Sequence, residues 1–332
     1  MPDATPPPSL TETLANLPIL WILALIAGLT VLRLALIRLP SHGARSAAEL
    51  SETGLIAVTL VYLIIRPFFV QAFYIPSASM EATLQGNSRT KDRILVPKFQ
   101  YRLHPPRRDD VVVFLAPPAA MGGDPPFVKR LIGLPGDRLE SVAGHVLVGG
   151  KWYSHADVRA ALGAAGEFGA QAQADGYVDQ ADHHVKFVAG GVMADKRLIG
   201  TERLAQILTG MPHAPVAVVP GYNIRNGVKL EEPFIAEDPD YDMKIYHGEP
   251  VKHEHDPSQA EYKWNGLPIT AAEFAKEYAQ PTEPLPAGRY LMMGDNRNDS
   301  NDGTNWGLLE HWRIVGPARV VFWPPADMGV IH

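Results

Sequence analysis

The pattern of apolar and polar positions divides the chain into an apolar N-terminal part and a longer part built of short apolar runs. Residues 13–32 carry no charge and are mostly Leu, Ile, Ala and Val, a length that crosses a bilayer as a helix. A second apolar stretch, residues 54–73, is interrupted by Arg66 and Pro67. We therefore expect one or two transmembrane helices, at 14–33 and 54–73. For the second stretch, a buried helix of the soluble part is the alternative.

A cleavable signal peptide is the alternative for the first stretch. Such a peptide begins with positive charge, whereas residues 1–12 contain no Lys or Arg and include Asp3 and Glu12. We favour a retained membrane helix.

Charge predicts the orientation of the two helices. The loop between them carries Arg38 and Arg45, with Arg33 at its border, and the N-terminal tail carries no positive side chain. Because positive loops stay in the cytoplasm, everything after Phe73 is expected on the outer side of the membrane. The sequence thus predicts a multi-pass membrane protein with its soluble part on the outer side.

Beyond residue 84 the pattern changes to short β-branched or aromatic runs that end in Gly, Pro or Asp, which is typical of strands and turns. Examples are "RILVPKF", "DVVVFLAPP", "FVKRLIGLPGD" and "RIVGPARVVFW". Residues 155–285 differ, since they are rich in Ala, Gly, His and acidic residues with little periodicity. We expect a mainly β domain made of 74–154 and 286–332, an inserted lobe at 155–285 and a membrane anchor at 1–73.

The amino-acid composition argues against several kinds of site and partner. The chain of 332 residues has no Cys, which excludes disulfides, Cys-based zinc sites and a Cys nucleophile. Its net charge of −6 argues against a nucleic-acid partner, because such proteins carry a basic excess.

Candidate chemistry lies in "YIPSASMEATL", where Ser77 and Ser79 follow the second apolar stretch. A serine hydroxyl needs a base to become a nucleophile, and none of the 12 His stands in a recognisable triad order. A buried Lys is the alternative base, because burial favours its neutral form. Lys129 in "FVKRLIG" suits this role, and strand alternation suggests that one of Lys129 and Arg130 faces inward. Spacing alone leaves Lys91 and Lys98 open.

Three other patterns are weaker. Residues 88–91 match S-x-x-K but lack its partner motifs. The run "NDSNDG" resembles a calcium loop that would place Leu309 where Glu is required. "HGEPVKHEHD" offers His247, His253 and His255 to a metal, but without ordered spacing we favour a solvated loop.

Four segments in order resemble the type I signal peptidases (leader peptidases), which are membrane-anchored serine–lysine endopeptidases. They are "IPSASMEATL", "RILVPKFQY" with "RRDDVVVF", "FVKRLIGLPGD" and "GDNRNDSNDGTNWG". The resemblance runs from about residue 66 to 323, apart from the lobe. It implies a signal-peptidase-like β domain and cleavage of signal peptides after a small-x-small site, with no cofactor or metal.

The resemblance also implies roles for particular residues. Ser79 corresponds to the nucleophile, Lys129 to the general base and Ser77 to a side-chain donor of the oxyanion hole. Ser300 and Asp302 correspond to residues that orient the lysine. Six residues correspond to the lining of shallow substrate pockets: Phe73, Ile75, Pro76, Leu84, Phe127 and Val128.

The chain departs from the family pattern at three places. Ala82 replaces a usual Pro, "NRNDS" inverts the usual Asp-Asn order at 298 and 299, and Thr304 replaces an Arg that pairs with the acid at 302.

The partners implied by the resemblance are signal-peptide-bearing preproteins, the lipid bilayer and a nearby secretion translocon. It also implies a location in the inner (plasma) membrane, with the catalytic domain on the external (periplasmic) side. Two alternatives are a catalytically weak, membrane-anchored binding module and a self-processing protease. "AQAQA" near residue 172 offers a cleavage site for the latter.

Overall fold

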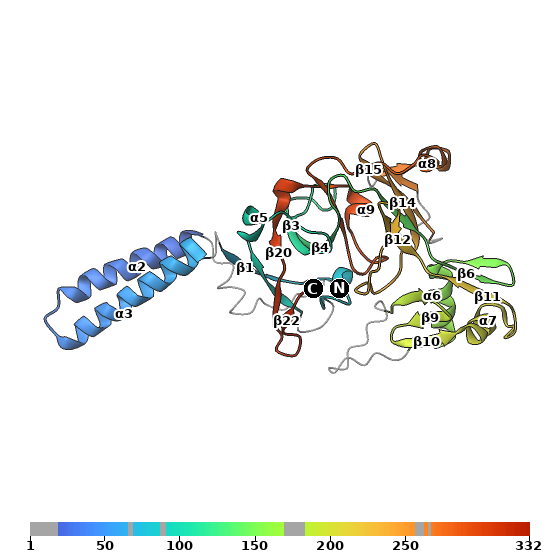
Figure 1. The fold of residues 1–332 in the computed structure, drawn as a ribbon. Coiled ribbons are helices and arrows are strands. Elements are labelled where there is room, and N and C mark those ends of the chain that lie inside the picture. The colour runs from blue at the N-terminus through green and yellow to red at the C-terminus, as the bar shows by residue number, and fades with distance from the viewer. Residues whose placement is uncertain (1–18, 66–68, 87–90, 169–182, 256–261, 265–266) are drawn as a thin grey trace. The chain divides into compact units, whose positions relative to one another are not determined.

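The computed structural model describes residues 19–65, 69–86, 91–168, 183–255, 262–264 and 267–332 (Figure 1). The chain divides into two compact units, residues 1–73 with 95–104 and residues 74–94 with 105–332. The segment near 172 that resembles a cleavage site lies outside the described residues.

The first unit is built on a pair of helices, α2 (Ile19–Ile37) and α3 (His42–Thr59), which lie side by side in Figure 1. Ser41 ends the turn between them, and its Oγ accepts a hydrogen bond from the Ala44 backbone N–H (3.2 Å) as the N-cap of α3. An ion pair between Arg33 and Glu52 (2.8 Å) joins the two helices. The unit also holds η1 (Leu60–Ile65), β1 (Val70–Tyr74) and α5 (Gln100–Leu103).

The outward side chains of this helical pair are apolar. Leu20 and Leu50 are each 74% exposed, and Trp21, Val31 and Ile56 are also exposed. Two segments, Leu20–Ile37 and His42–Leu63, are long and apolar enough to cross a membrane by length and composition. Among the described residues of the unit these apolar side chains stay exposed, which fits a lipid environment.

The helix boundaries differ from those expected from sequence. The second helix begins at His42, not at residue 54, and β1 already begins at Val70. Arg45 therefore lies in the first turn of α3 rather than in a loop. The charged run around Glu49 and Glu52 was interpreted as loop, but the Ser41 cap and Ala-rich "SAAEL" make it the first half of a helix.

The second unit centres on a five-stranded antiparallel sheet in the order β19-β18-β4-β3-β20. Its core strand β4 carries Lys129 and is paired on both sides, with β3 and with β18. The strands of this sheet are β3 (Val111–Leu115), β4 (Pro126–Gly133), β18 (Arg289–Met293), β19 (Leu309–Glu310) and β20 (Ile314–Pro317). Further short elements are β2 (Arg93–Pro97), α9 (Gly303–Trp306), η3 (His311–Arg313), β21 (Val320–Trp323) and β22 (Gly329–Val330).

A seven-stranded sheet, in the order β13-β12-β5-β14-β15-β16-β17, joins residues of the expected β domain and of the expected lobe. Its strands are β5 (Leu139–Val142), β12 (Tyr222–Arg225), β13 (Val228–Lys229), β14 (Tyr241–Tyr246), β15 (Glu249–Glu254), β16 (Tyr262–Trp264) and β17 (Leu267–Ile269), followed by α8 (Ala271–Tyr278). Since β5 pairs with β12 and β14, residues 222–285 do not form a separate lobe.

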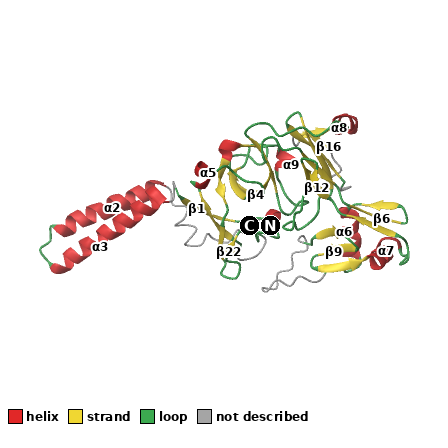
Figure 2. Ribbon diagram, viewed as in Figure 1, coloured by secondary structure: helices red, strands yellow, loops and turns green. Residues whose placement is uncertain are grey.

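A smaller subdomain with its own core comprises, among its described residues, two three-stranded sheets and two helices, coloured by type in Figure 2. Its apolar core includes Val158, Phe187 and Leu204, all at most 1% exposed. Its elements are β6 (His145–Val148), β7 (Lys151–Tyr153), α6 (His155–Ala164), β8 (Val185–Val188), β9 (Gly191–Ala194), β10 (Arg197–Gly200), α7 (Thr201–Thr209) and β11 (Val216–Val219). The lobe expected at 155–285 is thus replaced by a subdomain of about residues 145–219. The fold is mainly β with two N-terminal apolar helices, as the sequence predicts.

Candidate active site

Ser79 lies in a single 3-10 turn, η2 (Ala78–Met80), between two buried residues. Ala78 and Met80 are 4% and 1% exposed, whereas Ser79 is half-buried. The backbone N–H groups of Thr83 and Leu84 both donate to the Met80 carbonyl (2.8 Å each) and close the turn. The turn therefore buries the residues on either side of Ser79, while Ser79 itself stays partly exposed. Ala82, where the family usually has Pro, lies inside this closed turn.

Lys129 reaches Ser79 from the middle of β4. Its Nζ donates a short hydrogen bond to Ser79 Oγ, and its side chain is only 4% exposed. Lys91, one of the alternative bases, is exposed, and its Nζ contacts the Pro76 carbonyl instead (3.3 Å). The geometry therefore selects Lys129 as the partner of Ser79.

Burial changes the acidity of Lys129. Removal of the ammonium group from water lowers the Lys129 pKa to about 8, although Asp302, Asp295 and Asp299 favour the charged form and limit the change. A lysine with this pKa is partly neutral near physiological pH, which is the state that accepts a proton.

Ser77 precedes the turn with an extended backbone and an exposed side chain. Its Oγ lies 3.3 Å from Ser79 Oγ, within hydrogen-bond distance. Gly86 allows this arrangement, because a Cβ at that position would lie 1.7 Å from the Ser77 carbonyl oxygen. The chain thus folds back tightly against the Ser77 backbone.

Ser300 and Asp302 lie close to this pair. A Cβ on Gly294 would come within 2.6 Å of both the Ser300 side chain and the Ser79 carbonyl, so these two groups approach one another across Gly294. Ser300 Oγ is buried without a hydrogen bond to any residue of the described chain. Asp302 is fully buried and accepts hydrogen bonds from the Gly294 N–H (2.9 Å) and from Thr304.

Two departures from the family pattern have structural counterparts. Thr304 replaces an Arg, yet its N–H and Oγ1 both donate to Asp302 Oδ1 (3.0 and 2.8 Å). Asn298 connects the loop that follows β18 to the segment before β14. Its side chain accepts a hydrogen bond from the Asp240 N–H (3.1 Å) and donates one to the Asp238 carbonyl (3.0 Å). The buried carboxylate and the loop are therefore held by neutral hydrogen bonds.

Arg130 is a supporting residue whose role the sequence did not reveal. Strand alternation suggested that one of Lys129 and Arg130 faces inward, and in the structure both are buried, Arg130 with 1% and Lys129 with 4% exposed. On the opposite face of β4, Arg130 forms a bidentate ion pair with Asp295 (2.8 and 2.7 Å) and donates to Thr83 Oγ1 (3.1 Å). The pair connects β4 to the turn after Ser79.

The residues expected to line substrate pockets have different exposures. Ile75 and Leu84 are 2% and 0% exposed, Phe127 and Val128 are half-buried, and Pro76 is exposed. Phe73 is half-buried and belongs to the first unit. The Lys129 Nζ lies 5.9 Å from the centre of the Phe127 ring, so Phe127 is beside the dyad.

A polar cavity of about 490 Å³ borders the site but does not contain it. Ser300, Asn296 and Arg297 line one part, and His155, His184 and Glu237 line another. Neither Ser79 nor Lys129 contributes to its lining.

Comparison with known proteins identifies similar chains. The family model described as "Signal peptidase, peptidase S26" matches residues 47–198 and 208–323, a range that includes Ser79, Lys129 and Asp302. The chain is 27% identical over 285 residues to the probable signal peptidase I-2 of Synechocystis sp., with 85% of this chain and 76% of that protein covered. It is 26% identical over 269 residues to signal peptidase I of Leptolyngbya laminosa, with 80% and 74% covered. A shorter match of 86 residues, 43% identical, relates it to signal peptidase I of Aquifex aeolicus, with 26% and 31% covered.

Proposed function

Since this chain belongs to the signal peptidase family, peptidase S26, we propose that it removes N-terminal signal peptides from exported preproteins by means of a Ser79–Lys129 dyad. The observation that carries the dyad is the hydrogen bond from the buried Lys129 Nζ to Ser79 Oγ. The reaction needs only groups of this chain and water, with no cofactor or metal.

The proposed reaction begins when neutral Lys129 takes the proton of Ser79 Oγ, which attacks the carbonyl carbon of the scissile bond. The Ser77 hydroxyl and the Ser79 N–H donate hydrogen bonds to the oxyanion that forms. The Lys129 ammonium then protonates the leaving amine, and the peptide bond breaks to give an ester on Ser79. Lys129 next takes a proton from water, whose oxygen attacks the ester carbonyl carbon. The bond from that carbon to Ser79 Oγ then breaks, Lys129 returns the proton to Oγ, and the released product carries the new carboxyl group.

Asp302 and Ser300 position the lysine in this proposal. Asp302 is the first of the acidic groups that favour the charged form of Lys129, so it stabilises the ammonium present after the first proton transfer. Ser300 Oγ, which has no partner in the described chain, is available to accept from Lys129 in the reacting complex.

The proposed substrate is a chain with small residues just before the cut and two positions earlier. The substrate is expected to bind as an added strand along "FYIPS". Alternate substrate side chains then face the enzyme near Ile75, Leu84 and Val128, which are apolar. A charged side chain there would be buried without a partner, which is costly.

Cleavage of a preprotein by the purified full-length protein in detergent tests the proposal. We expect Ser79→Ala and Lys129→Ala to abolish cleavage, and Lys129→Arg to fail as well because a guanidinium does not give up its proton. Ser77→Ala should lower kcat by about 10²–10³ with little change in KM, as for loss of one oxyanion donor.

Two controls accompany this assay. Lys151→Ala changes an exposed lysine of β7 and should leave cleavage unchanged. A preprotein with Asp just before the cut should resist the wild-type protein. Turnover by Lys129→Arg would contradict the dyad, and binding of the preprotein without cleavage by the wild type would assign the chain a binding function instead.

A further inference from the structure

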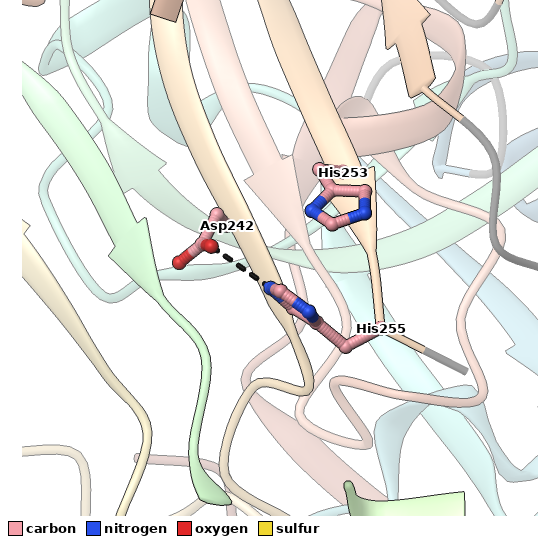
Figure 3. A group of neighbouring side chains, drawn as sticks. All are labelled: Asp242, His253 and His255. Atoms are coloured by element: carbon pink, nitrogen blue, oxygen red, sulfur yellow. Dashed lines mark hydrogen bonds and ion pairs between the residues drawn. The ribbon is translucent and has the colours of Figure 1, made fainter. Parts of the chain in front are cut away.

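Three metal-ligating side chains meet on the hairpin formed by β14 and β15, and neither Ser79 nor Lys129 belongs to this group. Asp242 and His253 are register partners on the two strands, and His255 follows two positions after His253. Because side chains two positions apart point to the same face of a strand, both imidazoles lie on the Asp242 side of the hairpin. Figure 3 shows the three side chains directed toward one another.

The distances suit a single ion. One ligand atom from each residue can be chosen so that all three lie within 4.8 Å of one another, and His255 Nε2 is 2.9 Å from Asp242 Oδ2. Zinc binds imidazole nitrogen and carboxylate oxygen at about 2.0–2.2 Å, so neighbouring ligand atoms stand roughly 3–3.5 Å apart. Small side-chain rotations that bring His253 closer would therefore complete the geometry.

The surroundings orient the three side chains. The Ala143 N–H donates to Asp242 Oδ1 (3.0 Å), which leaves Oδ2 directed at His255. The His253 ring stacks on Tyr262, with ring centres 4.4 Å apart and planes at 11°. The His255 ring packs against Trp152 at 5.5 Å. A backbone donor on a ligating carboxylate and fixed imidazole rings are the outer-shell features that metal sites use.

We propose that Asp242, His253 and His255 bind one divalent transition-metal ion, with Zn²⁺ as the preferred occupant and water in the remaining position. Two imidazoles and one carboxylate match the ligands of zinc sites that keep an open position, whereas Ca²⁺ and Mg²⁺ prefer oxygen ligands only. The ion would cross-link β14 to β15 and, through the Ala143–Asp242 bond, fix the end of β5. Its role is to stabilise the seven-stranded sheet.

His247 does not belong to this site, although the sequence grouped it with His253 and His255. It lies in the turn between the two strands with a backbone φ of 49°, and its ring makes tilted contacts with Tyr246 and Trp264. The expected solvated loop is instead an ordered hairpin, and the acid that completes the cluster is 11 positions upstream of His253 on the partner strand.

The test is a Zn²⁺ titration of the full-length protein, purified in detergent without a polyhistidine tag and stripped with a chelator. We expect one Zn²⁺ per chain by calorimetry, and a thermal transition that rises with Zn²⁺ because the ion binds the folded state. His253→Ala and His255→Ala should each weaken binding by at least about 100-fold, at the upper end of the loss seen for outer-shell partners. Co²⁺ in place of Zn²⁺ should give d–d absorption bands in the wild type and not in these two ligand variants.

His247→Asn is the matched control, because it removes a histidine of the same hairpin and Asn tolerates a positive φ. It should bind Zn²⁺ as the wild type does. Asp242→Asn, checked for its fold by circular dichroism, serves as a third ligand variant if an Ala variant does not fold. The proposal is overturned if the wild type binds no Zn²⁺, which leaves Asp242–His255 as an ion pair only. Equal binding by wild type and the His253→Ala/His255→Ala double variant would also overturn it.

Discussion

Lys129 shows how one residue is placed for reactivity at a cost in stability. Its ammonium is buried in β4 with its Nζ against Ser79, and burial lowers its pKa to about 8. An unfolded lysine titrates near 10.4. Between these two pKa values the unfolded chain binds more protons than the folded chain, so this residue's contribution to stability rises with pH across that window. Below pH 8 the full penalty remains, about 3 kcal/mol at 1.36 kcal/mol per pKa unit.

We therefore predict that Lys129→Met makes the protein inactive but more stable. The free energy of unfolding should rise by about 1–3 kcal/mol at pH 7, because Met keeps the length of the side chain without the buried charge. The gain should shrink as the pH approaches 10. Denaturation of both proteins in detergent at pH 7 and pH 9.5 measures it, with the exposed Lys151→Met as the control. A Lys129→Met protein less stable than wild type at pH 7 would show that the ammonium is well stabilised where it lies.

At the residue scale, the sequence indicated which types of side chain take part in the site but not which of them interact. Resemblance pointed to Ser79 and Lys129, but spacing left three lysines open. Arg130 and Asp295 form their ion pair across 165 positions of the chain. Because such partners meet only through the order of strands in a sheet, no local pattern reveals them.

At the scale of elements, the turn that carries Ser79 is connected to the strand β8 by an ion pair. His184 immediately precedes β8, and its Nε2 lies 3.2 Å from Glu81 Oε2, two residues after Ser79. Hydrogen bonds with Glu237 and Glu81 raise the His184 pKa to about 10, so the imidazolium persists at neutral pH. The folded pKa exceeds the unfolded value near 6.5. The stabilisation is thus complete below pH 6.5 and is lost as the pH rises through 10.

His184→Gln is predicted to lower the thermal transition at pH 7 by a few degrees, since Gln keeps hydrogen bonding but loses the charge. The difference from wild type should disappear near pH 10.5. Cleavage should fall about 3–10-fold, because Glu81 and the adjacent turn lose their anchor, a cost of roughly 1 kcal/mol in transition-state stabilisation. Differential scanning fluorimetry and the preprotein assay measure both effects, with the exposed His213→Gln as control. Equal transitions for the two variants at pH 7 would rule out an anchoring role.

Elements with a strong local signal were predictable, and their boundaries and partners were not. The runs "RILVP" and "VVVFL" are strands, as expected. The start of α3 was missed because Glu49 and Glu52 interrupt its apolar pattern, whereas the Ser41 cap and Arg33–Glu52 pair make these residues helical. Asp242 lies opposite His253 because of the strand register in the β14–β15 hairpin. Such cross-strand neighbours cannot be recognised from the order of residues along the chain.

At the scale of the whole molecule, long-range pairing decides the domain organisation. Residues 222–285 looked like part of a lobe because their composition differs from that of the first strands. They join the sheet of β5 instead, for example through Ile224 opposite Glu140. The subdomain at about 145–219 folds around its own apolar core. Short strands such as β6 and β8 alternate buried and partly buried side chains, so they form this core only when they pair with one another. The amino-acid composition therefore indicated an additional subdomain but placed its C-terminal end at residue 285 instead of about 219.

The helical pair of the first unit predicts the membrane orientation. α2 and α3 are antiparallel and joined at residues 38–41, so Ile19 and Ile65 lie at the opposite end from this turn. Arg33 is paired with Glu52, and Arg38 and Arg45 are the charges from which the positive-inside rule predicts a cytoplasmic turn. We predict that alkaline phosphatase, whose disulfides form only outside the cytoplasm, is active when fused after His332 and inactive when fused after Ser41. Replacing both Arg38 and Arg45 by Gln should reduce the activity of the His332 fusion several-fold, because some of the chains then insert in the opposite orientation. The control Arg93→Gln, which lies outside the turn, should leave this activity unchanged. An active Ser41 fusion with an inactive His332 fusion would reverse the topology and place Ser79 on the cytoplasmic side, away from the signal peptides that emerge on the outer surface.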